Sequence, residues 1–398
     1  MDSTPAIDST AVPDRARVAD STVGAASGDD GLIRPSQGAR KVAIVLFNLG
    51  GPDRPEAIRP FLLNLFRDPA ILRVPFFVRP FLARIIARAR VKPATENYAI
   101  LGGKSPLLEL TQNQAAALEA ALPECQAKCF IAMRYWHPFS LEAARAVRDW
   151  NPDSVVLLPL YPQFSTTTTG SSLNAWREAA AQVGLAARTT LLCCYPTDPA
   201  FIQATAANVA AEYARARATL PQNVPLRVLF SAHGLPEIII TKGDPYQWQV
   251  ERTVAAVMQH WPSPRGSSGA GDVDHVVCYQ SRATPQKWIG PSTDEEVERA
   301  ARDKVAVLVV PIAFVSEHSE TLVELDVEYR ELAERLEVPG YFRVPTQNAD
   351  AAFIKSLAGL VRRSLAHGPG LCSGGATCAE GHLDCPWRVE RSSGLAER

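Results

Sequence analysis

The stretch VLFSAHGLP, residues 228–236, places a histidine at the point where an apolar run of strand length ends. Gly234 follows His233 directly, and a glycine lets a ligand approach the backbone closely. The matching stretch in the first half of the chain, FNLGGP, has no ionisable residue, so the architecture alone does not require this histidine. An imidazole with a pKa of about 6.5 exchanges protons at neutral pH. We therefore predict a functional role for His233.

A row of carboxylates follows another strand-like run, in the stretch FVSEHSETLVELDVEYRELAERL. Glu320, Glu324 and Glu328 are spaced at i, i+4 and i+8, which places them on one face of a helix. A solvated acidic face is the alternative, but no lysine or arginine interleaves with the three glutamates. A histidine and carboxylates at one cleft suit a divalent metal or the removal of protons. The H-E-x-x-H spacing of zinc hydrolases is absent.

Other polar side chains follow strand-like runs in the first half of the chain. The stretch MRYWHP places Arg134, Tyr135 and Trp136 together, and a cation beside two aromatic rings suits a flat, anionic, aromatic ligand. A packed cluster at the rim of a sheet is the alternative. The hydroxyl-rich stretch 161–176, YPQFSTTTTGSSLNAW, fits either helix caps or an anion-binding nest.

Four strand-like runs recur in the same order in the two halves of the chain. The pairs are 45–52 with 228–236, 129–138 with 275–285, 155–165 with 305–316, and 193–202 with 342–354. Helix-length stretches separate the runs, which is typical of parallel sheets with helices on both faces. The sequence therefore predicts an internally duplicated α/β protein with two similar doubly wound domains. Such domains bind ligands at the carboxyl ends of their strands.

The composition divides the chain into parts. Residues 1–40 lack the apolar segment of a secretory signal, and we expect a disordered leader there. We expect an N-terminal α/β domain at 41–205, which contains an insertion at 59–106, and a C-terminal α/β domain at 206–365. A cysteine-containing tail would then occupy 366–398.

The insertion mixes large apolar side chains with many arginines. Between residues 59 and 90, Asp68 is the only acid. A buried hairpin with exposed arginines is one interpretation. Because so long an apolar segment lies outside the recurring runs, we favour a lid that covers an apolar ligand or touches a membrane surface.

Charge and cysteine content limit the class of protein. The formal net charge of −1 argues against a nucleic-acid partner. Eight cysteines in 398 residues are too few for a secreted disulfide scaffold and suit a reducing compartment. No apolar run reaches the roughly 20 residues of a membrane span. We therefore expect a protein that is cytoplasmic or peripheral to the inner membrane.

The motifs between residues 42 and 361 together resemble those of the ferrochelatase family, lyases that insert Fe²⁺ into protoporphyrin IX in the last step of haem biosynthesis. The most specific are NLGGP, GGKSPL, MRYWHP, YPQFSTTTTGSSLN, SAHGLP, GDPY, CYQSRATPQKWIGPSTDE and PIAFVSEHSETLVELDVEY. The resemblance implies two Rossmann-like domains of the chelatase type, with the insertion as an apolar lip over a porphyrin cleft. It also implies Fe²⁺ and protoporphyrin IX as substrates.

The resemblance assigns roles to individual residues. His233 matches the family's essential histidine and Glu320 its metal-site glutamate, so both would be catalytic and bind the metal. Glu324 and Glu328 would form an acidic path beside them. The positions that match the lining or gate of the porphyrin pocket are Arg90, Tyr98, Ser105, Arg134, Tyr135, Tyr161 and Trp288.

Other functions stay open on the sequence. A cobalt or nickel tetrapyrrole chelatase would keep His233 and a carboxylate, although the lip and the TTTTGSSLN stretch fit the iron enzyme better. A haem or porphyrin carrier would bind the ring without turnover. A two-lobed solute-binding protein also has paired α/β halves, but it needs no titratable cluster and would carry a secretion signal.

The tail concentrates Cys372, Cys378 and Cys385. Some ferrochelatases hold a [2Fe–2S] cluster with three tail cysteines and one from the body, and clustered thiols suit such a centre. The spacing differs here, and Thr166 stands where the animal form has its body cysteine. A [2Fe–2S] cluster, a small zinc site and an unliganded tail therefore stay open. Candidates for a fourth ligand are Cys193, Cys194, Cys278 and His382, whereas Cys125 and Cys129 suit the role less.

Overall fold

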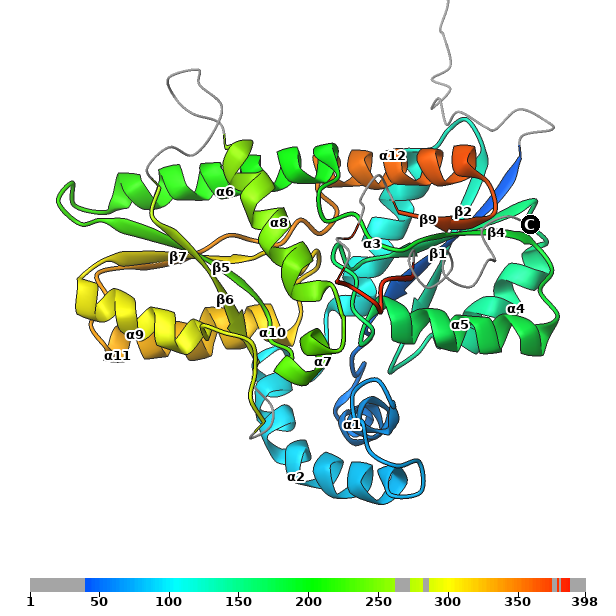
Figure 1. The fold of residues 1–398 in the computed structure, drawn as a ribbon, viewed down its shortest axis with the longest axis horizontal. Helices are drawn as coiled ribbons and strands as arrows, with labels where there is room; N and C mark the ends of the chain where they lie inside the picture. Colours follow the sequence, from blue (N-terminus) through cyan, green and yellow to red (C-terminus); the bar gives the residue numbers. More distant parts are fainter. Residues whose placement is uncertain (1–39, 262–272, 282–285, 374–377, 379–380, 387–398) are drawn as a thin grey trace, which may run out of the picture. The chain divides into compact units, whose positions relative to one another are not determined.

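Two parallel sheets organise the protein (Figure 1). The computed structural model describes residues 40–261, 273–281, 286–373, 378 and 381–386, so the predicted leader lies outside the described residues apart from Arg40. The first sheet has the strand order β2-β1-β3-β4-β9, and the second has β6-β5-β7-β8. All paired strands within each sheet run parallel. The predicted α/β fold class is thereby confirmed.

The recurring runs of the sequence are equivalent strands of the two sheets. The first sheet contains β1 (Lys41–Asn48), β2 (Gln126–Met133), β3 (Ser154–Pro159), β4 (Arg188–Leu192) and β9 (Gly370–Cys372). The second contains β5 (Leu226–His233), β6 (His275–Gln280), β7 (Ala306–Pro311) and β8 (Tyr341–Arg343). Strands β3 and β7 are buried at every position, as continuous Val and Leu runs of parallel sheets require.

Helices cover both faces of each sheet. On the first sheet, α4 (Ser140–Trp150) and α5 (Thr169–Val183) share a core with β1 and β3, and α3 (Leu107–Ala120) covers the other face. On the second sheet, α9 (Thr293–Asp303) and α11 (Tyr329–Arg335) share one core, and α7 (Glu237–Thr241) and α8 (Tyr246–Gln259) lie on the other face.

Two long helices exchange between the halves (Figure 1). α6 (Pro199–Thr219) follows β4 of the first sheet but packs on β7 and β8 of the second. α12 (Ala351–His367) follows β8 but packs on α3, β3 and β4 of the first sheet. The boundary expected between residues 205 and 206 therefore falls inside α6. The expected tail begins within α12 and contributes β9 to the first sheet. An apolar helix face fits either sheet, so the pattern alone did not reveal this exchange.

The insertion forms a helical pair apart from the helices that cover the sheets (Figure 1). α1 (Ile58–Arg67) and α2 (Arg79–Ile100) pack on each other around a small core with Phe61 and Tyr98. Phe76, Phe77 and Phe81, by contrast, are 78%, 72% and 67% exposed. The insertion is thus more than a buried hairpin, because large apolar side chains lie on its surface. Within the described ranges, we find no helix with both the length and the apolar character to cross a membrane.

Candidate active site

The carboxyl edge of the second sheet carries the histidine and the first glutamate singled out in the sequence. His233 is the last residue of β5, and α10 (Ser319–Leu322), which contains Glu320, follows β7. We expected Gly234 to admit a ligand to the backbone, but its neighbour is protein. A Cβ at this position would lie 2.8 Å from the Gln280 carbonyl oxygen of β6. Glycine is required here by strand packing.

His233 and Glu320 are directly hydrogen-bonded. Nδ1 of His233 lies 3.0 Å from Oε2 of Glu320, and Nε2 of His318 lies 3.6 Å from the same oxygen. The side chains of His233 and Glu320 are 36% and 28% exposed, so both remain within reach of a ligand. His318, in contrast, is buried. Sequence reasoning did not assign a role to His318, although its place two residues before Glu320 was a usable signal.

The two groups shift each other's pKa in opposite directions. Burial lowers the pKa of His233, but the charge of Glu320 and its hydrogen bond outweigh burial and raise the pKa above 6.5. Burial raises the pKa of Glu320, but the charge and hydrogen bond of His233 outweigh it and hold the pKa far below 4.5. The pair therefore favours an imidazolium beside a carboxylate.

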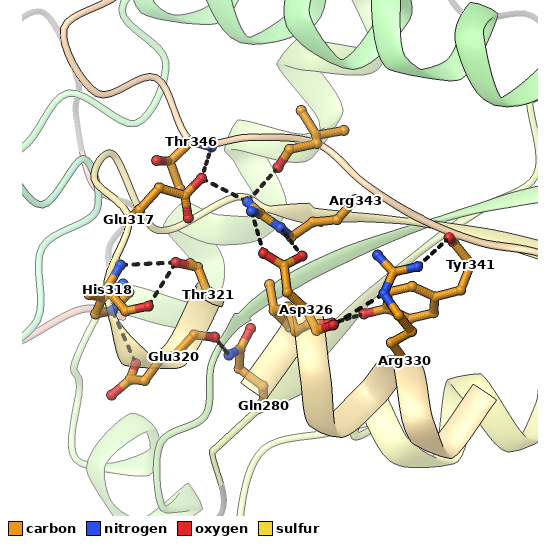
Figure 2. A network of polar contacts seen from close by, with 12 residues as sticks. Gln280, Glu317, His318, Glu320, Thr321, Asp326, Arg330, Tyr341, Arg343 and Thr346 are labelled. Atoms are coloured by element: carbon orange, nitrogen blue, oxygen red, sulfur yellow. Dashed lines mark hydrogen bonds and ion pairs between the residues drawn. The ribbon is translucent and has the colours of Figure 1, made fainter. Parts of the chain in front are cut away.

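Glu324 lies next to this pair and is held by several donors. It accepts hydrogen bonds from Ser281 N at 2.8 Å, Ser281 Oγ at 2.5 Å, Gln280 Nε2 at 2.9 Å and Tyr329 Oη at 3.3 Å. Nε2 of Gln280 also donates to the Glu320 carbonyl at 2.8 Å (Figure 2). Burial and the charge of Glu320 raise the pKa of Glu324. Gln280, at the end of β6, is a further residue that sequence reasoning missed.

The three glutamates line one cavity of about 580 Å³. The helix that carries them is not a regular α-helix, because a π-helical turn at Glu324–Glu328 separates α10 from α11. The amide of Glu328 bonds to the Val323 carbonyl five residues earlier, at 3.0 Å. Asn97 of α2 donates to Glu328 Oε1 at 3.2 Å, so the lip forms part of the wall of this cavity. π-Helical turns are frequent at functional sites.

Two of the predicted pocket residues from α2 lie beside this acidic row. Arg90 lines the cavity together with the three glutamates. Burial raises the pKa of Tyr98 to about 12, a hydrogen bond with Ser319 opposes the shift, and the charge of Glu320 adds to it. Tyr98 therefore contacts α10 directly. Ser105 lies behind it, so close to the backbone that a Cβ on Gly51 would approach its side chain to 2.5 Å.

Arg134 and Tyr135 form a separate group around Asp68 of the insertion. Arg134 Nη2 lies 2.8 Å from Asp68 Oδ2, the Tyr135 hydroxyl donates to the same oxygen at 2.9 Å, and Ser171 Oγ also donates to it. The Tyr135 ring is fully buried, so it supports this cluster from the interior. Tyr161 packs against the core under α4 and α5. Trp288, by contrast, lies near His233, where its strand bridge to Pro236 covers Gly234.

The structure brings two tail cysteines close to two cysteines of the body. Cys193 and Cys194 follow β4, with their sulfurs 3.5 Å apart, and Gln249 Nε2 reaches the sulfurs of Cys194 at 3.5 Å and Cys378 at 3.2 Å. Cys378 is in turn hydrogen-bonded to Cys385. In the part of the chain that is described, no three His, Cys, Asp or Glu side chains are arranged to hold a metal ion.

The other cysteine candidates lie elsewhere. Cys372 is paired in register with Leu192 and packs in the core on the α12 face of the first sheet, whereas Cys193 and Cys194 belong to the core on the opposite face. Cys278 is buried under α9 in the second half. His382 stacks against Trp248 at 5.3 Å between ring centroids.

Comparison with known proteins places the chain in a family. The family model for ferrochelatase matches residues 41–365. The ferrochelatase of Caulobacter vibrioides is 53% identical over 360 residues, which cover 89% of this chain and 99% of that protein. The ferrochelatase of Hyphomonas neptunium is 48% identical over 355 residues, covering 87% and 95%. Among solved structures, SirB from Bacillus subtilis with Fe³⁺ is 13% identical and covers 82% of this chain and 96% of its own, with a TM-score of 0.47. On the extent of the sequence matches, the chain belongs to the ferrochelatase family.

Proposed function

We propose that this ferrochelatase inserts Fe²⁺ into protoporphyrin at the carboxyl edge of the second sheet, with His233 and Glu320 as its catalytic pair. The observation that carries the assignment is the 3.0 Å contact between a partly exposed imidazole and a partly exposed carboxylate. At the carboxyl end of β1, Leu49 stands where His233 stands at the end of β5, and the exposed pair His137–Glu142 of the first half lies beyond β2, at the start of α4. Iron and protoporphyrin are the substrates that the family implies.

Insertion requires two pyrrole N–H protons to leave and the metal ion to shed water. A neutral imidazole at His233 accepts one of these protons, which is general base catalysis. Glu320 offers an oxygen ligand to the incoming cation. Because the charge of Glu320 holds the proton on His233, a cation bound to Glu320 weakens that hold and lowers the pKa of His233. Metal arrival thus prepares the base.

Glu324 and Glu328 supply an acidic path between this pair and the cavity mouth. The raised pKa of Glu324 suits a group that takes up a proton and passes it on. Glu328 lies further out, against Asn97 of the lip. Arg90, Tyr98, Ser105 and Trp288 would then line or gate the porphyrin pocket around His233, and the Arg134–Asp68 cluster, with Tyr135 and Tyr161, would support its far wall.

Turnover separates this function from porphyrin carriage. Purified protein is mixed anaerobically with Fe²⁺ and protoporphyrin, and product is followed by its absorbance. We expect many turnovers per chain in the wild type and none above background in His233→Ala. Stoichiometric porphyrin binding without turnover would instead make the protein a carrier. The same assay with Co²⁺ and Ni²⁺ compares the metals: a clear preference for either over Fe²⁺ would reassign the chelatase.

We infer a peripheral membrane contact for the lip. Phe76, Phe77 and Phe81 expose more than half of their surfaces, and Arg84 and Arg88 of α2 are also exposed. Aromatic side chains beside arginines suit an anionic membrane surface. The wild type should sediment with anionic phosphatidylglycerol vesicles, and a triple Phe→Ser variant at these positions should not. Equal sedimentation of both proteins would show that these phenylalanines do not mediate membrane binding.

We further propose that the cysteines hold a [2Fe–2S] cluster. What supports this proposal is that four thiols lie near one another in two pairs, Cys193 with Cys194 and Cys378 with Cys385, linked through Gln249; they would have to move closer together to bind the cluster. Compared with the expected set of three tail cysteines and one body ligand, this set replaces Cys372 with a second cysteine of the body. When bound, the cluster would supply a cross-link between tail and body. Anaerobic protein should contain about two irons and two labile sulfides per chain, and Cys193→Ser should lose them while Cys372→Ser keeps them. A colourless wild type without labile sulfide would end this proposal and leave the chelatase assignment intact.

A further inference from the structure

One buried guanidinium holds both ends of the segment that carries Glu320 and Glu324 (Figure 2). Arg343, the last residue of β8, is 10% exposed. Its Nε and Nη2 donate to the two oxygens of Asp326 at 2.6 Å each, and its Nη1 donates to Glu317 Oε1 at 2.8 Å. Glu317 precedes the two cavity glutamates and Asp326 follows them, so Arg343 fixes the segment from both sides.

The Glu317 end sets the start of α10. Glu317 Oε1 also accepts a hydrogen bond from the Thr346 amide at 2.9 Å, which ties it to the chain beyond β8. The next residue, His318, donates its amide to Thr321 Oγ1 at 3.0 Å and places its ring 3.6 Å from the Glu320 carboxylate. A fixed Glu317 therefore fixes the direction from which Glu320 leaves the backbone.

The Asp326 end sets the π-helical turn. A wide turn disturbs the regular ladder of backbone hydrogen bonds, and here side chains bind two of its carbonyls. The Tyr341 hydroxyl donates to Leu325 O at 2.6 Å, and Arg330 Nε donates to Asp326 O at 3.1 Å (Figure 2). Together with Arg343, Tyr341 anchors the turn to β8. A return to an α-helical turn would rotate Glu324 relative to Glu320.

The arrangement of charges in the segment also supports a positioning role for Arg343. Residues 317–328 contain five carboxylates. Arg343 pairs with two of them, while Glu320, Glu324 and Glu328 line the cavity. Buried carboxylates without a partner are strongly unfavourable, so Arg343 is needed to divide the segment into a side that it binds and a side that faces the cavity. The planar fork of arginine serves two carboxylates at once, which the single ammonium of lysine cannot do with the same geometry.

We propose that Arg343 is a positioning residue for metal capture, which orients Glu320 and Glu324 toward the incoming Fe²⁺ without touching either substrate. The proposal rests on the proposed function, in which Glu320 binds the metal. It predicts that loss of the clamp affects the Michaelis constant for the metal rather than that for porphyrin.

Arg227 offers a matched control in the same half of the protein. Its side chain is 11% exposed and also binds two carboxylates, Asp274 at 2.7 Å and Asp303 at 2.9 Å. It lies near the start of β5, at the opposite end of the strand from His233. Arg343→Met and Arg227→Met therefore remove the same kind of buried clamp, one beside the glutamates and one away from them.

The test measures Tm, kcat and both Michaelis constants in full-length Arg343→Met, Arg343→Lys, Arg227→Met and Glu320→Gln. We expect both methionine variants to lower Tm, but only Arg343→Met should raise KM for Fe²⁺, by about tenfold, with KM for porphyrin within about twofold of the wild type. For Arg343→Lys we expect a KM for Fe²⁺ between those of the wild type and Arg343→Met. If Arg343→Met does not fold, Arg343→Lys and Asp326→Asn give the same readout.

Two results would overturn the proposal: an unchanged KM for Fe²⁺ in the folded Arg343 variants, or an equal rise in Arg227→Met. Glu320→Gln separates this failure from failure of the proposed function. An unchanged KM for Fe²⁺ in Glu320→Gln would show that Glu320 does not bind the metal, which would refute the proposed function. A raised KM for Fe²⁺ in Glu320→Gln, together with an unchanged KM in the Arg343 variants, would refute only the positioning role of Arg343.

Discussion

The carboxyl edges of the two sheets have equivalent strands but different side chains. Strand register pairs Phe47 with Pro159 in the first sheet and Ser231 with Pro311 in the second. Two residues further along, Leu49 therefore takes the place that His233 takes in the second sheet. One edge ends in an apolar side chain and the other in a titratable one.

The last residue of β1, Asn48, is a polar side chain that is bound within the protein. Asn48 Nδ2 donates to Thr111 Oγ1 at 3.0 Å, and both side chains are buried. At the second edge, His233 and Glu320 keep exposed surface and contact each other. With the proposed function, the comparison teaches that one scaffold serves two tasks: the second half would supply the chemistry, while the first half and its lip would supply the binding wall.

The largest expected effect is the loss of the base. His233→Ala should lower kcat at least a hundredfold, because a general base contributes about 10²–10⁴ in rate. Its Tm should stay close to that of the wild type, since the side chain is partly exposed at a sheet edge. Steady-state insertion kinetics and calorimetry check both. Retention of more than about a tenth of wild-type kcat would show that His233 is not an essential base.

Glu320→Gln should have the next largest effect. A carboxamide keeps the size of the side chain but not its charge, so we expect kcat to fall about tenfold to a hundredfold and KM for Fe²⁺ to rise. Porphyrin affinity, measured by fluorescence quenching, should be unchanged. Unchanged kcat with weaker porphyrin affinity would move Glu320 from the catalytic pair to the pocket wall.

Asp68→Asn tests the first half. The Asp68 carboxylate, 2% exposed, receives Arg134, Tyr135 and Ser171 on one oxygen, and an amide cannot accept all three in this way. Breaking such a buried pair costs about 3 kcal/mol of unfolding free energy. We expect a lower denaturation midpoint and a raised KM for porphyrin, with kcat reduced less than threefold. A hundredfold loss of kcat would place chemistry in this half as well.

The smallest expected effect is a shift in pH dependence. Glu320 raises the pKa of His233 above 6.5, so the neutral base is lost below that raised value. Removing the charge in Glu320→Gln lowers the pKa of His233, and the acidic limb of kcat/KM should therefore move to lower pH. A profile of residual activity between pH 5 and 9 measures the limb. A shift to higher pH would contradict the assigned coupling.

Much of the fold could be predicted because buried parallel strands have continuous apolar runs in their sequences. The order of β5 to β8 repeats that of β1 to β4, and this gave the duplication. The exchange of α6 and α12 could not be predicted, since the burial of one helix face does not say which sheet it covers. The short strand β9, which pairs with β4 at the edge of the first sheet, could not be predicted either, because three residues are too few to mark a strand in the sequence.

The site was predictable where topology decides it. Strand ends of parallel sheets meet at one edge, which brings together the segments that carry His233 and Glu320. The π-helical turn was not predictable, because Tyr341 and Arg343, which hold it, belong to a later strand. Nor was the burial of Tyr135, since an aromatic residue at a strand end suits a core as well as a pocket.

The most direct test of the division between the two halves compares His233→Ala with Arg134→Ala on the same assays. Porphyrin Kd is measured by fluorescence quenching, and single-turnover Fe²⁺ insertion is measured on the preformed porphyrin complex. We predict that His233→Ala binds porphyrin as the wild type does and does not insert iron. Arg134→Ala should bind porphyrin more weakly and, once saturated, insert iron at a rate near that of the wild type. If both variants lose binding and insertion in equal measure, the two edges do not divide the work and the account is wrong.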